Sequence, residues 1–295
     1  MTTLRIKVTF VDNSEKTYNS WDFLDDKEIV VNITKLVCGS NKLTSLPDSL
    51  GKCTKLKILD CQNNKLTSLP DSLSNCTKLE FLECHGNKLT SLPDSLGKCS
   101  NLKEIFCGYN KLSSLPDSLS NCTKLEGLYC NNNKLTSLPN LLGNCTKLVY
   151  LFCKNNKLNS LPNSLNKCTK LQLLQCENNN LTSLPDSLGN CKPRSNLQYL
   201  YCYNNNLTSL PDSLGNCTKL QLLQCENNKL NSLPNSLGNC KPRSNLQLLQ
   251  CSNNNLTSLP DSLGNCTNLQ NIFCWNNKLF SLPNSLGNCT NLENL

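Results

Sequence analysis

Eleven copies of one 23-residue unit make up most of this 295-residue chain. The unit reads L-x-x-L-x-C-x-x-N-x-L-x-S-L-P-x-x-L-x-x-C-x-x, and two copies carry a Lys-Pro-Arg insertion, at 192–194 and 241–243. A unit this short cannot enclose its own apolar side chains, so neighbouring units must stack and share one core. Each position of the unit, numbered from its first residue, then becomes a column along the stack. The units start at Ile33, Leu56, Leu79, Leu102, Leu125, Leu148, Leu171, Leu197, Leu220, Leu246 and Leu269.

The first six positions of the unit predict a short β-strand. Apolar residues at positions 4 and 6 alternate with variable residues at 3 and 5, as in a strand with one buried face. The Ser-Leu-Pro segment predicts a turn and then an extended or single-turn helical path, because proline fixes φ and has no N–H to donate. Gly, Ser or Asn at position 19 predicts a tight turn that returns the chain. Each unit is therefore expected to form one coil.

Position 9 is asparagine in all eleven units, from Asn41 to Asn277. A polar column among leucines needs a structural reason, because buried backbone groups of a turning chain must be paired. An amide side chain has two donors and an acceptor. We therefore expect a ladder in which each asparagine bonds the backbone of the turns above and below it.

These residues carry a family resemblance. The pattern L-x-x-L-x-(L/C)-x-x-N-x-L resembles the leucine-rich-repeat signature. Its continuation is similar to the intracellular class with L-P-x-x-L-x-x-L, found in Ras-pathway scaffolds and Roco-type proteins, although cysteine replaces leucine twice per unit. The regularity also resembles uncharacterised leucine-rich-repeat proteins of giant viruses and protists. The resemblance implies an α/β-type solenoid, a horseshoe with a concave parallel β-sheet and a convex face of turns, extended segments and short 3-10 helix, which binds protein ligands on the concave face.

Three segments follow from this pattern. Residues 1–32 are predicted to form an N-terminal capping segment, a β-hairpin with Trp21, Phe23 and Leu24 covering the first coil. Residues 33–291 hold the eleven repeats, and residues 292–295 are the start of an incomplete twelfth. Solenoid ends need shielding. No capping segment follows residue 292, so self-association through the C-terminal end is one expectation.

The 22 cysteines form two columns, at positions 6 and 21. Both columns fall on expected core positions, where free cysteine packs as a small hydrophobic side chain. No C-x-x-C occurs, the closest pair is eight residues apart, and the chain has one histidine. Zinc sites favour clustered ligands at short spacing. We predict reduced thiols and neither a metal nor a cofactor, with thiols brought together by stacking as the alternative.

The aromatic residues indicate a binding surface. Variation among the units concentrates at positions 3, 5, 7 and 8, which are predicted to line the concave face, and eleven of the twelve aromatics after residue 32 occur there. Exposed aromatics on one face are typical of protein interfaces. The alternative is that they stabilise neighbouring strands. The zone from Phe106 to Phe152 is expected to contribute most affinity. The candidate partner-binding residues are Phe81, Phe106, Tyr109, Tyr129, Tyr150, Phe152, Tyr199, Tyr201, Tyr203, Phe273 and Trp275.

Charge supports a second candidate function. The net charge is +8, and position 10 is lysine in eight units, which places a lysine rim beside the concave face. Such a rim beside aromatics can bind nucleic acid or another polyanion. Only three arginines occur, which argues against nucleic acid because arginine is its preferred reader. The insertions hold two of them, and we expect both insertions to be tolerated loops.

Catalysis and secretion find no support in the sequence. No phosphate-binding loop, nucleotide fingerprint or nucleophile elbow occurs, and His85 follows Cys84 so that the two side chains face opposite ways. The remaining carboxylates are expected at exposed positions. Arg5 and Lys7 interrupt the apolar start, unlike a signal peptide, and no apolar run reaches membrane-spanning length. We predict a cytoplasmic, non-enzymatic protein-binding scaffold, with the recognition part of a larger signalling protein as a further alternative.

Overall fold

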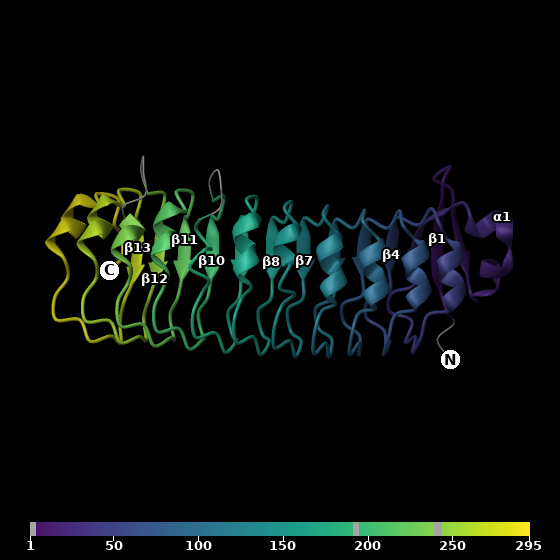
Figure 1. Ribbon diagram of the computed structural model, residues 1–295, viewed down its shortest axis with the longest axis horizontal. Coiled ribbons are helices and arrows are strands. Elements are labelled where there is room, and N and C mark those ends of the chain that lie inside the picture. The colour runs from purple at the N-terminus through teal and green to yellow at the C-terminus, as the bar shows by residue number, and fades with distance from the viewer. Residues whose placement is uncertain (1–3, 191–194, 239–243) are drawn as a thin grey trace. The chain divides into compact units, whose positions relative to one another are not determined.

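The computed structural model describes residues 4–190, 195–238 and 244–295 of the chain. The chain divides into two compact units, Met1–Lys147 and Leu148–Leu295. In each of them, successive coils stack in chain order, as the progress of colour along the ribbon shows (Figure 1). The two Lys-Pro-Arg insertions, predicted to be loops, lie outside the described residues.

The first unit holds a sheet in the order β2-β1-β3-β4-β5-β6-β7. Strand β1 is antiparallel to β2 and β3, and the strands from β3 to β7 are parallel. Its strands are β1 Ile6–Phe10, β2 Glu15–Tyr18, β3 Ile33–Val37, β4 Ile58–Asp60, β5 Phe81–Glu83, β6 Glu104–Phe106 and β7 Gly127–Tyr129. Its helices are the 3-10 turns η1 Asp22–Asp25, η2 Asp48–Lys52, η3 Asp71–Asn75, η4 Asp94–Lys98, η5 Asp117–Asn121 and η6 Leu142–Asn144, and the α-helix α1 Lys27–Val30.

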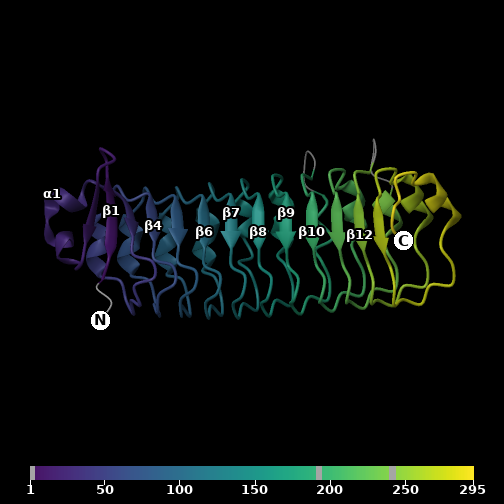
Figure 2. The same cartoon turned by 180° about the vertical axis from the view of Figure 1, so that it is seen from behind.

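The segment before the first repeat packs directly on it. Strands β1 and β2 form a hairpin, and β1 extends the sheet beside β3 (Figure 2). Asp26 caps α1, because its carboxylate accepts hydrogen bonds from the N–H groups of Glu28 and Ile29. Phe23 and Leu24 are buried, and Lys52 of the first coil donates a hydrogen bond to the Leu24 carbonyl. The hairpin therefore covers the edge of β3, which would otherwise be open.

The second unit repeats the parallel arrangement in the order β8-β9-β10-β11-β12-β13. Its strands are β8 Tyr150–Phe152, β9 Leu173–Gln175, β10 Tyr199–Tyr201, β11 Leu222–Gln224, β12 Leu248–Gln250 and β13 Asn271–Phe273. Its 3-10 helices are η7 Asn163–Lys167, η8 Asp212–Asn216, η9 Asn235–Gly238, η10 Asp261–Asn265 and η11 Asn284–Asn288.

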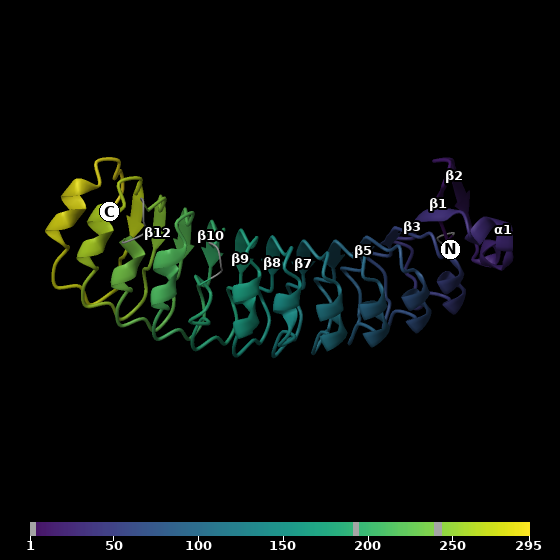
Figure 3. The same cartoon turned by 45° about the horizontal axis from the view of Figure 1, so that its top comes forward.

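Register in both units is set by identical columns. Position 4 of each strand pairs with position 4 of the next, as in Leu59 with Leu82 and Leu223 with Leu249. These leucines and the position 6 cysteines from Cys38 to Cys251 are buried, whereas Cys274 is half-buried. The strands form one layer and the 3-10 helices the other (Figure 3). The predicted repeat solenoid, with a parallel sheet on one side and 3-10 turns on the other, is therefore confirmed. We call the side of each sheet that faces away from this core the open face.

The asparagine column pairs the backbone of the stacked turns. The Asn87 amide donates to the carbonyls of Cys84 (3.1 Å) in its own turn and Cys61 (3.0 Å) in the preceding coil. Its oxygen accepts from the N–H of Leu66 (3.0 Å), also in the preceding coil. The following coil is reached by its own asparagine, Asn110, which donates to the Cys84 carbonyl. The predicted ladder exists, but each rung reaches back one coil only.

Position 19 lies in a tight turn, because the Cys53 N–H donates to the Leu50 carbonyl (3.0 Å) around Gly51, but this is a 3-10 turn without positive φ. Among the described residues, Gly86 is the only glycine with positive φ, and it occupies position 8. Glycine suits position 19 for space, because a Cβ on Gly51 would lie 2.6 Å from the Ser72 carbonyl oxygen of the next coil. The left-handed turn lies at position 8, where all eleven residues have positive φ. Asparagine fills eight of those places because it tolerates this conformation best after glycine.

The position 21 cysteines have a polar role inside the core. The Cys99 thiol lies 3.4 Å from the Leu73 carbonyl oxygen of the preceding coil, and Cys76 lies 3.6 Å from Leu50 in the same way. These carbonyls belong to 3-10 helices whose last groups need partners. A thiol is a weak hydrogen-bond donor, whereas a leucine side chain has no donor. Burial raises the pKa of Cys99 to about 11 and that of Cys76 to about 12, so these thiols stay protonated and available as donors.

We predict that Asn87→Ala lowers the free energy of unfolding by about 3 kcal/mol, because buried backbone groups on two coils lose their partners. Urea unfolding followed by circular dichroism measures the change. Lys88→Ala, the neighbouring exposed position, is the control and is expected to change stability by less than about 0.5 kcal/mol. Equal stability of the two variants would contradict a structural role for the ladder.

Candidate functional site

Three of the predicted partner-binding aromatics of the first unit lie on the open face. Phe81, Phe106 and Tyr129 are half-buried on β5, β6 and β7, while their neighbours at position 4 are fully buried. Successive strand residues point to opposite sides of a sheet. The rings therefore lie on the side away from the leucine core, as alternation at positions 3 and 5 predicts.

Phe106 and Tyr129 form a stacked pair. Their ring centroids are 4.3 Å apart and their planes differ by 6°. Gly127 makes room for this arrangement, because a Cβ at that residue would lie 2.7 Å from the Tyr129 ring. Such cross-strand pairs contribute about 0.2–1 kcal/mol to a sheet. Part of the role of these two rings is thus to stabilise neighbouring strands, the alternative that the sequence left open.

Tyr109 has no such packing role. Its ring is 62% exposed, and its backbone has a φ of 54°, in the left-handed turn at position 8. The other ten repeats have Asn, Ser or Gly at position 8. A bulky residue in this conformation costs about 1 kcal/mol or more. An exposed aromatic that destabilises its own turn is a candidate for a functional contact.

The second unit carries the remaining predicted aromatics, and none of them is buried. Tyr150 is exposed, and the Trp275 ring, which meets Phe273 edge to face at 5.5 Å, is 52% exposed. The Tyr199 hydroxyl donates to Gln221 Oε1 at 3.1 Å. The half-buried members are Phe152, Tyr199, Tyr201, Tyr203 and Phe273.

Position 7 departs from the prediction. The carboxylates were expected at exposed positions, yet Glu177 is 1% exposed and Glu226 is 9% exposed, with Ser252 buried in the next coil. Strand alternation ends at position 6, because the left-handed turn at position 8 redirects the chain. The sequence signal for this was the asparagine column at position 8, such as Asn178 and Asn227.

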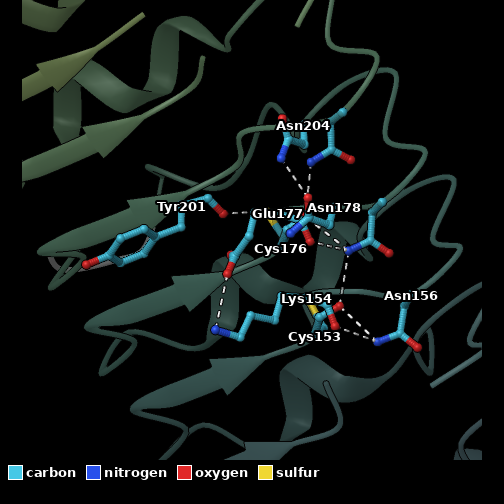
Figure 4. Close-up of polar contacts among 10 residues, drawn as sticks. Cys153, Lys154, Asn156, Cys176, Glu177, Asn178, Tyr201 and Asn204 are labelled. Carbon is cyan, nitrogen blue, oxygen red and sulfur yellow. Dashed lines mark hydrogen bonds and ion pairs between the residues drawn. The ribbon is translucent and has the colours of Figure 1, made fainter. Parts of the chain in front are cut away.

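The two buried glutamates differ in their partners. Lys154 lies 3.5 Å from Glu177 Oε1, as the close-up shows (Figure 4). Oε2 of Glu177 and Oε2 of Glu226 have no hydrogen-bond partner among the described residues. Burial raises the pKa of Glu177 against the opposing effects of its own N–H and Lys154. Burial also raises the pKa of Glu226, whose own N–H lowers it and which Glu177 raises further.

A lysine pocket lies beside the hairpin in the first unit. Its volume is about 600 Å³, and Val11 and Ile58 supply apolar lining. No carboxylate is among the described residues that line it. The lysines that line it are Lys35, Lys55, Lys57 and Lys78. The pocket lies beside the first residues of β3 and β4, because Lys35 and Ile58 belong to those strands, whereas the predicted lysine rim at position 10 follows the strands.

Cys84 and His85 are adjacent in the chain but differ in burial. Cys84 lies in the core, where burial raises its pKa far above the ordinary value of 9, while His85 is half-buried. Across residues 4–190, 195–238 and 244–295 no three His, Cys, Asp or Glu side chains come together in a group suited to a metal ion. Within the same ranges no helix has the length and apolar character to span a membrane.

Family models match most of the repeat region. A model described as two copies of the leucine-rich repeat matches residues 31–75, 77–121, 100–143 and 195–238, and a single-repeat model matches 170–191 and 245–266. Together they cover more than half of the chain. The chain belongs to the leucine-rich-repeat family. Proteins of this family are generally interaction modules.

Solved leucine-rich-repeat structures resemble the chain closely. A leucine-rich-repeat protein of Leptospira interrogans is 30% identical, with a TM-score of 0.69 over 91% of this chain and 73% of its own. The plant peptide hormone receptor RGFR1, solved in complex with RGF2, is 30% identical, with a TM-score of 0.78 over 91% of this chain and 45% of its own. InlJ of Listeria monocytogenes, whose functional domain includes a cysteine ladder, is 26% identical, with a TM-score of 0.63 over 92% and 59%. No curated protein sequence matches the chain.

We predict that Tyr109→Asn raises the free energy of unfolding by about 1 kcal/mol, because asparagine relieves the left-handed strain. Tyr150→Asn is the control, since Tyr150 is also exposed but has no positive φ. Urea unfolding compares the two variants. A Tyr109→Asn variant no more stable than the parent leucine-rich-repeat protein would contradict the strain argument.

The raised pKa of Glu226 predicts a pH-dependent stability. Burial disfavours the charged form of Glu226, so as pH falls towards the ordinary value of 4.5 the folded state takes up its proton before the unfolded state does. Glu226→Gln should therefore be more stable than the parent at pH 7, with a difference that shrinks as pH falls through the raised pKa. Glu177, Tyr203 and the neighbouring thiols are the other titratable groups nearby.

Urea unfolding across pH 4 to 8 measures this difference. Glu177→Gln is the matched control, because it leaves Lys154 without its ion pair and should gain less. Lower stability of Glu226→Gln at pH 7 would show that the Glu226 charge is stabilised by contacts other than those described.

Proposed function

We propose that this leucine-rich-repeat protein is a non-enzymatic interaction module that binds a protein partner on the open faces of its sheets. Tyr109 is the observation that carries the proposal. The residue is 62% exposed, it occupies a turn position where asparagine fits better, and its ring stacks on no other ring among the described contacts. A contact made only in a complex accounts for a tyrosine at this place.

The other aromatics support the same reading. Large rings with few rotatable bonds contribute much contact area at low entropic cost, which is why interfaces are rich in Tyr and Trp. Tyr150 and Trp275 leave large parts of their rings exposed on the second unit. Phe106 and Tyr129 form a flat, preorganised apolar surface on the first unit. The proposed contact residues are the eleven aromatics predicted from the sequence.

The comparisons support a protein or peptide as the ligand class. The receptor RGFR1 was solved in complex with RGF2, and this chain spans 45% of that receptor chain. We propose the same general mode here, with a partner of unknown identity, and recognition within a larger signalling protein is compatible with it. Membership of the intracellular L-P-x-x-L-x-x-L class, a cytoplasmic location and reduced thiols belong to this proposal. They are supported by the motif and by the burial of most cysteines in the described ranges.

Paired alanine variants test the proposal in each unit. Phe106→Ala with Tyr129→Ala changes the first unit, and Tyr150→Ala with Phe152→Ala changes the second. Capture of partners from extracts of the native host, quantified by mass spectrometry, should drop at least about 10-fold for a variant that removes central aromatics, since such residues contribute 2 kcal/mol or more. Circular dichroism checks that each variant stays folded.

Phe280→Ala is the matched control for these pairs. Phe280 is an aromatic residue that is 90% exposed but lies outside positions 3, 5, 7 and 8. Its removal should leave capture unchanged. The open-face proposal would be wrong if both paired variants captured the partner as well as the parent does. It would also be wrong if Phe280→Ala lowered capture as much as the paired variants do.

The lysine pocket supports a second candidate function, binding of a polyanion. Four lysines line one pocket, and among the described hydrogen bonds only the Lys55 ammonium has a partner, Asn32, at 3.3 Å. Binding of this kind weakens steeply with salt because counterions are released. A polyanion such as heparin that binds equally well at about 50 and 200 mM salt would exclude this candidate.

A further inference from the structure

The second unit contains the same buried carboxylate twice, in two different settings. Residues 171–219 and 220–268 are near-identical blocks, and they place Glu177 and Glu226 at equivalent positions. Each glutamate is buried at position 7, two residues after the end of its strand. In both, burial raises the pKa of the carboxyl and the residue's own backbone N–H lowers it. Their local structure is therefore alike, and only the neighbouring columns differ.

The preceding coil supplies the difference. Lys154 occupies position 7 before Glu177 and places its ammonium 3.5 Å from the carboxylate (Figure 4). Tyr203 occupies the corresponding place before Glu226. No lysine or arginine of the described residues forms an ion pair with Glu226. A buried carboxylate without a cation is costly, because desolvation is not repaid by an opposite charge.

A second polar atom lies unpaired beside Glu226. Ser252 follows it in the same column, and the Asn227 N–H donates to the Ser252 carbonyl at 3.1 Å, which holds the two coils together. Adjacent strands are about 4.8 Å apart. Glu226 Oε2 and Ser252 Oγ are both buried and have no partner among the described residues. Each such group costs about 1–3 kcal/mol when left unsatisfied.

The chemistry of these groups selects the ligand. Lys154 shows, inside this chain, that a cation pairs with one carboxylate oxygen, Oε1, of the equivalent glutamate. At Glu226 the ligand must also donate to a hydroxyl one strand away, so it needs several N–H donors in a fixed fork. A guanidinium has five such donors, and it also stacks on aromatic rings such as Tyr203.

We propose that Glu226 and Ser252 form a receptor site for an arginine side chain of the protein partner. The arginine takes the role that Lys154 has at Glu177, with one edge of the guanidinium on the Glu226 carboxylate and another N–H on Ser252 Oγ. Tyr203 is half-buried and its hydroxyl makes no described hydrogen bond. The proposal requires its ring to turn aside and cover the guanidinium. This inference rests on the proposed function, because it names one group of the partner.

A small probe tests the site without the partner. The full chain is labelled with ¹³C at glutamate carboxyl carbons and titrated at pH 7 with N-acetyl-L-argininamide. N-acetyl-L-citrullinamide, a neutral molecule of nearly the same shape, is the control. The Glu226 signal, assigned by its loss in Glu226→Gln, should shift saturably with the arginine probe and stay unmoved with the citrulline probe. The Glu177 signal should not respond, because Lys154 already occupies that site.

Two variants sharpen the result. Ser252→Ala should weaken the binding of the arginine probe roughly 2- to 10-fold, the loss of one ordinary hydrogen bond. Lys154→Met should make the Glu177 signal respond to the probe. An unmoved Glu226 signal, or equal shifts with both probes, would overturn the proposal. The two proposals fail separately. If the arginine probe shifts the Glu226 signal but the aromatic variants capture the partner as well as the parent does, the arginine site is retained and open-face binding is refuted.

Discussion

The amide ladder at position 9 is the interaction on which the rest of the molecule depends. A coil that reverses direction inside a stack leaves carbonyl and N–H groups without strand or helix partners. Asn87 supplies partners to two coils at once, and equivalent asparagines do so along both units. Because the turns are satisfied internally, they can be buried against one another. The strands then align in register, and every other column follows from that alignment.

The register separates two surfaces with different tasks. Leucine and cysteine fill the side that the turns enclose, and the thiols at position 21 also bond to carbonyls of the previous 3-10 helix. The open face makes no contribution to this core. It therefore accepts almost any residue, which explains why Phe, Tyr, Gln, Glu and Gly all occur at positions 3 and 5. Because residues on the open face do not pack into the core, they can vary to suit a binding partner.

Most of the fold was predictable because it depends on spacing alone. The strand positions, the asparagine ladder and the side on which Phe106, Tyr129 and Phe152 lie all follow from a period of two within a period of 23. The burial of the position 7 side chains could not be predicted from this spacing. The alternation stops where Asn178 or Asn227 takes a left-handed φ, so Glu177 and Glu226 turn inwards. Neither the exact place of the turn nor the neighbour across the stack is visible in a single repeat.

The candidate site shows the same limit. Alternation predicted that the rings face outwards, yet it gave no sign that Phe106 and Tyr129 stack or that Gly127 gives them room. The strain at Tyr109 was not predicted either. The sequence did carry a signal for it, because the other ten repeats have Asn, Ser or Gly at position 8. These features arise between residues one coil apart, and a comparison of columns finds them more readily than a comparison of motifs.

Glu177 and Glu226 illustrate what stacking means for the evolution of such a chain. Duplication copied the acid, but its electrostatic setting was inherited from whatever residue happened to precede the copied block. A change from lysine to tyrosine 23 residues upstream thereby alters the acidity of a side chain that is itself unchanged. In an array of this kind, new chemistry can be created by shuffling neighbours while every individual repeat remains intact.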